Sequence, residues 1–320
     1  MSRRVLLTGV SGFVGGALGS HLRQLGYDVI GVSRSAPRPG SSTSHLTHDL
    51  AEPIPESWPH ADVIVHCAAL ASPWASPAAY RLHNVDATRN MLAYAERVGA
   101  SHFVFISSSS VHYGHGDQVD LTEDTPLPTI PINEYAATKR QGEELVRQSK
   151  VPWVILRPRA VFGPGDTVLF PRILRAAERG QLPRIVRPDG LSPRADLIFI
   201  ENLSHYAERA IALDAQGVFN LTNNQPVDLY PFLDGLLDKL NLPKPRKTVN
   251  VRTAMIFARL AELGSQYLMN YKEPPVTRFG VEVMAYSKTF NVSKMLAAFG
   301  PPPVSIETGV DRFIAWYRER

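Results

Sequence analysis

Cysteine is almost absent from this chain, since Cys67 is the only one in 320 residues. A disulfide within the chain and a zinc site built from cysteines are therefore excluded. No charge of one sign dominates: 34 basic and 30 acidic side chains leave a net charge of +4, and the basic ones are scattered. This balance does not favour nucleic acid or a membrane as a partner. The histidines have no metal-binding spacing, so no metal site is expected.

A long uninterrupted apolar run is missing as well. The stretch from Thr253 to Met269 is mostly apolar, but Arg259, Glu262 and Gln266 interrupt it, which favours a buried or amphipathic helix over membrane insertion. The first strand is expected to begin almost at Met1, which leaves no space for a signal peptide. We therefore expect a cytoplasmic protein.

What the chain does have, within fifteen residues, is a strand followed by a glycine turn. The apolar run 5–7 leads into Thr8-Gly9-Val10-Ser11-Gly12-Phe13-Val14-Gly15, and apolar residues at helical spacing follow. Gly9 permits a tight turn, Gly12 lets the backbone approach a pyrophosphate, and Gly15 lets the next helix pack closely on the sheet. Because the start of that helix offers free N–H groups to phosphates, the pattern predicts a dinucleotide site.

Strand and helix patterns then alternate up to about Leu156. This alternation predicts an α/β fold, a Rossmann-type doubly wound parallel sheet with a smaller, mostly C-terminal substrate lobe. The expected strands are 4–8, 28–32, 62–66, 102–107 and 152–156, and the expected helices are 13–25, 77–98 and 134–149. We assign residues 1–165 to the dinucleotide-binding domain, with strands near 196–200 and 218–222 returning to it. Residues 166–195 and 225–320 are assigned to the lobe.

A second pattern points to chemistry. Tyr135 and Lys139 are four residues apart, so they lie on one face of the expected helix. A lysine ammonium there lowers the pKa of the phenol and lets it exchange a proton with an alcohol or a ketone. A solvated helix face is the alternative. Residues 107–110 are four serines at the carboxyl end of an expected core strand, where a hydroxyl can bind the reacting oxygen.

With three glycines, a serine, a tyrosine and a lysine in this order, the chain resembles the extended short-chain dehydrogenase/reductase family, also called the NAD-dependent epimerase/dehydratase family. The stretches 66–69, 84–90 and 156–166 also resemble its motifs. The resemblance implies that Tyr135 exchanges the proton and that Lys139 tunes its pKa and binds the cofactor ribose. It assigns the substrate-oxygen ligand to Ser109, four residues before Tyr113, with Ser108 as the fallback. The cofactor-binding residues that we expect are Gly9, Gly12, Phe13, Val14, Gly15, Ser33, Arg34, Asp49, Leu50, Ala68, Ala69, Asn84, Tyr135, Lys139 and Pro158.

The end of the second expected strand bears on the cofactor. A carboxylate there would bind the adenosine ribose of NAD, but the chain has Ser33-Arg34 instead. Because an arginine can bind a 2′-phosphate with two donors, we expect a preference for NADP, with NAD as the alternative. Asp49 and Leu50 fit the family's adenine contact.

The later part of the chain bears on the substrate. Residues 194–205 are closest in pattern to the 3β-hydroxysteroid dehydrogenase-like branch, although Arg194 stays open as a phosphate ligand. The apolar stretch 254–271 either roofs a hydrophobic pocket or only packs within the lobe. We expect hydride transfer between nicotinamide and a secondary alcohol or ketone on a largely apolar, steroid-like or β-keto/hydroxy substrate. The alternatives are a nucleotide-sugar epimerase or dehydratase and a cofactor-sensing binding protein. The resemblance also implies a homodimer.

Overall fold

Seven parallel strands form the central sheet of the computed structural model, which describes residues 3–319. The order across the sheet is β3-β2-β1-β4-β5-β7-β12, and every neighbouring pair is parallel. The strands are β1 (Arg4–Thr8), β2 (Asp28–Ser33), β3 (Ser44–Thr47), β4 (Val63–His66), β5 (His102–Ile106), β7 (Trp153–Pro158) and β12 (Gly217–Leu221). The predicted fold class is confirmed, and the strand order reverses direction between β1 and β4, where ligands bind in open sheets of this kind.

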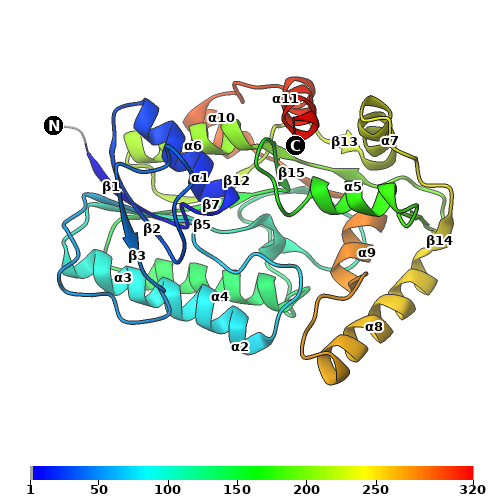
Figure 1. Ribbon diagram of the computed structural model, residues 1–320, viewed down its shortest axis with the longest axis horizontal. Coiled ribbons are helices and arrows are strands. Elements are labelled where there is room, and N and C mark those ends of the chain that lie inside the picture. Colours follow the sequence, from blue (N-terminus) through cyan, green and yellow to red (C-terminus); the bar gives the residue numbers. More distant parts are fainter. Residues whose placement is uncertain (1–2, 320) are drawn as a thin grey trace.

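Helices cover both faces of this sheet (Figure 1). On one face lie α1 (Phe13–Gln24) and α6 (Ile200–Ala212); on the other lie α3 (Ala87–Arg97) and α4 (Glu134–Gln148). Each face has its own apolar core, because the Val- and Ile-rich strands are buried on both sides. The expected helix 77–98 is three segments: α2 (Pro77–Tyr80), a π-helical stretch η1 (Arg81–Asp86) and α3.

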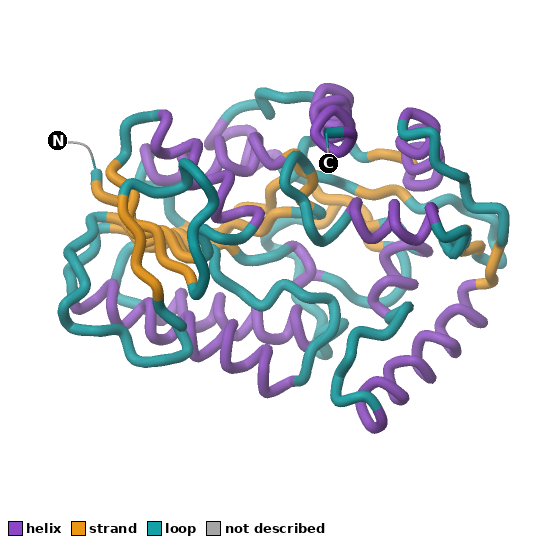
Figure 2. The backbone as a smooth tube through the Cα atoms, in the orientation of Figure 1, coloured by secondary structure: helices purple, strands orange, loops and turns teal. Residues whose placement is uncertain are grey.

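Small sheets and short helices build the rest of the molecule (Figure 2). A four-stranded sheet has the order β13-β10-β15-β6, and the pairs β11–β8 and β14–β9 stand apart. The strands are β6 (Gln118–Leu121), β8 (Val161–Phe162), β9 (Arg184–Val186), β10 (Arg194–Ala195), β11 (Ile198–Phe199), β13 (Val227–Asp228), β14 (Thr248–Asn250) and β15 (Lys288–Phe290). The helices are α5 (Phe170–Glu178), α7 (Leu229–Lys239), α8 (Val251–Leu268), α9 (Arg278–Ala285), α10 (Ser293–Phe299) and α11 (Ile306–Arg318).

One expectation about the sheet is wrong. The strand near 196–200 does not return to the central sheet, because Ile198 and Phe199 pair with Val161 and Phe162 instead. The strand near 218–222 does return, as β12 beside β7. β12 occupies the position at the sheet edge beside β7. β11 pairs instead with β8, the short strand that follows β7 in the chain. The closing helices α10 and α11 contribute Met295, Phe299 and Phe313 to the apolar core that also contains β1 and β7.

Candidate active site

A cavity of about 540 Å³ opens at the carboxyl ends of β1, β2, β4, β5 and β7. Its walls include the glycine turn, the serine segment and the first turn of α4. Of the residues predicted for cofactor or catalysis, the cavity is lined by Gly9, Gly12, Phe13, Val14, Gly15, Ser33, Arg34, Asp49, Leu50, Ala68, Ala69, Ser109, Tyr135, Lys139 and Pro158. Segments distant in sequence therefore meet in one space large enough for small-molecule ligands.

The glycine turn is shaped by close backbone contacts. Gly9 has φ +78°, which a side chain rarely adopts. A Cβ on Gly15 would lie 2.3 Å from the carbonyl oxygen of Gly9, so only glycine lets α1 approach the turn this closely. Gly12 is the N-cap of α1 and brings no side chain to the first N–H groups of that helix. These donors and the glycine wall fit the pyrophosphate of a dinucleotide.

Asn84 is the one predicted cofactor residue that is not in the cavity wall. It is buried in η1, where its Oδ1 accepts from the backbone N–H of Leu70 at 2.7 Å and its Nδ2 donates to Oγ1 of Thr138 at 3.0 Å. Leu70 lines the cavity and Thr138 lies in α4. The side chain is therefore committed to joining a wall segment to the helix of Tyr135.

The end of β2 forms the rim of the cavity. Arg34 is exposed, and its Nη1 lies 3.8 Å from Oδ2 of Asp49. Ser33 donates to the carbonyl of Ser35 at 2.6 Å and contacts Nε2 of His45 at 2.9 Å. The ion pair of Arg34 with Asp49 is exposed, and such pairs contribute little free energy. A phosphate can therefore take the place of Asp49 beside Arg34 with little loss of stability.

The two middle serines contact different tyrosines. Burial raises the pKa of Tyr135 to about 12, and a hydrogen bond to the Ser108 side chain opposes that rise. Ser109 instead hydrogen-bonds the hydroxyl of Tyr113 at 3.0 Å, in a buried contact. Ser108, the fallback, thus lowers the pKa of Tyr135 while its hydroxyl contacts that of Ser110 at 2.9 Å, and Ser109 has Tyr113 as its partner. A phenol with a raised pKa is protonated at neutral pH and can donate a proton.

Lys139 is buried one turn after Tyr135. Its Nζ donates to the carbonyl of Ile106 at 2.6 Å and lies 4.3 Å from the centroid of the Phe105 ring. Burial lowers the pKa of Lys139 to about 8, and the negative charge of Glu143 opposes that change. That Lys139 lowers the pKa of Tyr135 stays a prediction. The ammonium is directed at the end of β5, so burial dominates at the phenol.

A buried ion pair lies one further turn along α4. Arg157 binds both carboxylate oxygens of Glu143, at 2.8 and 2.6 Å, and Ser107 donates to the same carboxylate at 2.6 Å. The Nη1 of Arg157 also contacts Nε2 of His112 at 2.7 Å. These contacts join Ser107, at the start of the serine segment, and His112, which follows that segment, to α4 and β7. Sequence reasoning missed them, although Glu143 follows Lys139 at helical spacing.

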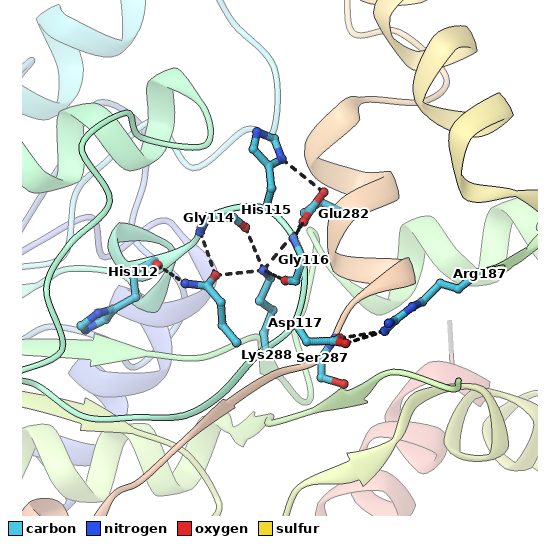
Figure 3. Close-up of polar contacts among 10 residues, drawn as sticks. His112, Gly114, His115, Gly116, Asp117, Arg187, Glu282, Ser287 and Lys288 are labelled. Carbon is cyan, nitrogen blue, oxygen red and sulfur yellow. Dashed lines mark hydrogen bonds and ion pairs between the residues drawn. The ribbon is translucent and has the colours of Figure 1, made fainter. Parts of the chain in front are cut away.

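The loop after the serine segment is held by a buried lysine (Figure 3). Lys288 donates to the carbonyls of Gly114 and Gly116 at 2.8 and 2.6 Å, and to Oε1 of Gln118 at 2.9 Å. Burial lowers the pKa of Lys288 to about 8. Glu282, from α9, accepts from the backbone N–H of Gly116 at 2.6 Å. Two elements from the end of the chain thereby fix the loop that begins at the tyrosine bonded to Ser109.

The lobe side of the cavity is apolar. Its wall contains Val168, Leu169, Phe279 and Val283. The apolar stretch 254–271 supplies none of the wall residues, and its large side chains mostly face outward. The stretch therefore does not roof the cavity, and it packs within the lobe only through its small residues. Its large apolar residues are exposed. Arg194 is exposed beside Asp228 and is not in the cavity wall either.

Comparisons with known proteins identify the family of the chain. Residues 5–221 match the NAD dependent epimerase/dehydratase family. The 2-alkyl-3-oxoalkanoate reductase of Stenotrophomonas maltophilia (strain K279a) is 31% identical, over 98% of each chain. A sterol-4-alpha-carboxylate 3-dehydrogenase of Saccharomyces cerevisiae is 29% identical, covering 85% of this chain and 80% of its own.

Solved structures resemble the whole fold. The structure described as MoeE5 in complex with UDP-glucuronic acid and NAD covers 99% of each chain with a TM-score of 0.74 and 22% identity. A UDP-galactose 4-epimerase covers 99% of each chain with a TM-score of 0.73 and 21% identity. At this level of identity the likeness establishes the fold alone.

Proposed function

The chain belongs to the NAD dependent epimerase/dehydratase family, and from that premise we propose that it transfers a hydride between a nicotinamide cofactor and a secondary alcohol or ketone on a largely apolar substrate. The observation that carries the proposal is the shared cavity. The glycine turn, Tyr135 and the apolar lobe residues Phe279 and Val283 all line the same space. Cofactor, proton donor and substrate wall are thus within reach of one another.

The roles of the residues follow from their contacts. A bound nicotinamide supplies or accepts the hydride. Tyr135 holds its proton at neutral pH, because burial raises its pKa to about 12, and it is the group that can pass this proton to a carbonyl oxygen. The side chain of Ser108 lies at the same hydroxyl and can bind that oxygen. Lys139, fixed at the Ile106 carbonyl, is placed to bind a ribose hydroxyl and to stabilise negative charge nearby.

The direction and the substrate class follow from the same residues. A protonated phenol favours reduction of a ketone, since the product alcohol needs one proton beside the hydride. The two curated relatives are named for 3-oxoalkanoates and for sterol carboxylates. We infer for this chain a 3-oxo or 3-hydroxy group on an apolar body, held against the Phe279 side of the cavity.

Nucleotide-sugar epimerisation is the second candidate function. The description of the matching family names epimerases and dehydratases, which keeps this class open. The position of Arg194 argues against it, because the side chain considered for a phosphate is outside the cavity wall. A cofactor-sensing binding protein is a third reading, and the presence of both Tyr135 and Lys139 in the wall argues against it.

Replacement of Tyr135 by Phe tests the proposal. We expect turnover of a 3-oxo substrate to fall by roughly 10²- to 10⁴-fold, because the proton donor is lost. Binding of the reduced cofactor, followed by its fluorescence, should stay unchanged. Near-normal turnover in the variant would contradict the assigned role. Turnover of UDP-sugars and of no ketone by the unaltered protein would favour the second candidate.

We carry four finer expectations forward as proposals. They are a preference for NADP over NAD, a cytoplasmic location, a homodimer through the face that contains α4, and a substrate lobe of residues 166–195 and 225–320 beside the 1–165 domain. The exposed Arg34 at the rim supports the first. No helix within residues 3–319 is both long and apolar enough to cross a membrane.

A further inference from the structure

Helix α8 presents its large apolar side chains to solvent. Ile256, Phe257, Leu260, Leu263, Tyr267 and Leu268 are between 40% and 85% exposed, and we call them the α8 face. Their spacing places them on one side of the helix. The opposite side buries the smaller Ala254, Ala258 and Ser265. Contiguous apolar surface of this kind marks an interaction site.

The segment that contains the α8 face has more basic than acidic side chains. Residues 244–272 contain one acidic side chain, Glu262, which Arg278 binds at 2.6 Å. Arg252 and Arg259 lie two helical turns apart along one edge of the face. The basic side chains of the segment are Lys244, Arg246, Lys247, Arg252, Arg259 and Lys272. Lys244 is paired with Asp238 at 2.6 Å, and Glu273 follows Lys272 directly. A partner of negative charge and apolar interior complements this surface.

The buried side of α8, opposite the α8 face, contacts a segment that contributes to the wall of the active-site cavity. Nε1 of Trp74 donates to Oγ of Ser265 in α8 at 2.8 Å, and the neighbouring Ser72 and Pro73 line the cavity. Helix α9 lies between α8 and the sheet (Figure 1). It lines the cavity with Phe279 and Val283 and packs on α8. Helix α8 therefore packs on the outside of α9, which forms part of the cavity wall.

We propose that the α8 face docks the protein peripherally on an anionic lipid bilayer. The size of the face favours this over a second copy of the chain. A helix of 18 residues is about 27 Å long and about 10 Å wide. Its stripe offers a few hundred Å², well below the roughly 800 Å² per partner of a stable interface. A two-fold contact would also oppose like charges.

Vesicle co-sedimentation without substrate or cofactor tests the docking. The protein should bind vesicles of phosphatidylcholine with about one-third phosphatidylglycerol, and bind at least tenfold less to pure phosphatidylcholine or in high salt. The double variant Leu260→Ser/Leu268→Ser should lose at least tenfold in binding and keep its thermal midpoint. The matched variant Leu25→Ser/Leu213→Ser removes two exposed leucines outside α8 and should bind as the unaltered protein does.

Three outcomes overturn the docking: no binding to either vesicle, unchanged binding of the Leu260/Leu268 variant, or a dimer that this variant dissociates in the absence of vesicle binding. An apolar substrate could reach the cavity from the lipid, and this consequence rests on the proposed function. The docking itself does not rest on it. The Tyr135→Phe variant separates them, since it should bind vesicles normally even with no turnover. If the unaltered protein binds vesicles but reduces no ketone, the proposed function fails and the docking stands.

Discussion

Ser108 and Ser109 are adjacent in the chain, yet each contacts a different tyrosine. Ser108 is near enough to Tyr135 to lower the pKa of the phenol, although its hydroxyl also contacts Ser110 at 2.9 Å. Ser109 hydrogen-bonds Tyr113 at 3.0 Å. We therefore predict that Ser108→Ala lowers turnover by about tenfold or more with little effect on cofactor binding. Ser109→Ala is the matched control, and its main effect should be on stability, by about 1 kcal/mol. Steady-state kinetics of both variants would show the opposite ranking if Ser109 were the substrate-oxygen ligand.

Arg34 carries the prediction about the cofactor. Because its guanidinium is exposed and 3.8 Å from Asp49, Arg34→Ser should lower the ratio of kcat/KM for NADPH over NADH by about tenfold. Asp49→Asn removes the competing carboxylate and should raise that ratio. An unaltered protein that prefers NADH would contradict the NADP proposal, and so would an Arg34→Ser variant with an unchanged ratio.

The same residues indicate what sequence alone can and cannot predict. Gly9, Gly15, Tyr135 and Lys139 could be found because local spacing determines their geometry: a turn, a close packing distance and one face of a helix. The contacts of Ser108 and Ser109 depend on the directions of their side chains. A run of four serines does not reveal these directions. The direction of Lys139 toward Ile106 depends on the end of β5, which no spacing along α4 reveals.

At the scale of elements, β15 holds the loop that follows the serine segment. Lys288→Met would leave the carbonyls of Gly114 and Gly116 and Oε1 of Gln118 without their shared donor. We predict a loss of stability of about 1–3 kcal/mol, faster hydrogen exchange of the amides in 114–118, and a lower kcat with unchanged cofactor affinity. Lys288→Arg keeps the charge and should restore part of kcat. Unchanged exchange and kcat in the methionine variant would reject the positioning role.

Helix α8 is where prediction from sequence was least complete at this scale. An amphipathic pattern reveals that a helix has two faces, but the usual assumption directs the larger apolar face inward. Here the small residues Ala254 and Ala258 are buried and Ile256 and Leu260 are exposed. Only the packing of α9, which arrives later in the chain, decides which side of α8 is covered. The same holds for β11, whose partner depends on which strand occupies the sheet edge.

At the scale of the whole molecule, Asp196 links stability to pH. It is buried, its Oδ2 accepts from the backbone N–H of Phe290 at 2.8 Å, and burial raises its pKa from 3.8 to about 6. A raised pKa means that the folded protein binds the proton more tightly than the unfolded chain does. Its contribution to stability is therefore full below pH 3.8 and is lost as the pH rises to about 6.

The variant Asp196→Asn should remove this dependence, because the amide resembles the protonated acid. We predict that the free energy of unfolding of the variant, relative to the unaltered protein, rises by about 2 kcal/mol between pH 4 and pH 7. Urea denaturation at both pH values measures it. A difference that is the same at pH 4 and pH 7 would show that Asp196 titrates normally.

The order of strands in the central sheet bears on how the chain assembles. β1 lies inside the sheet, with β2 and then β3 on one side, and β4, β5, β7 and β12 in turn on the other. Each later strand of the central sheet therefore pairs with a strand that was synthesised before it. The sheet can thus grow outward from β1 as the chain is made. Helix α4, which carries Tyr135 and Lys139, emerges after β5 and before β7, whereas Lys288 comes late in the chain. Tyr135 and Lys139 can therefore take up their positions beside the sheet early in synthesis. The loop 114–118 gains its hydrogen bonds to Lys288 only when the last part of the chain has been made.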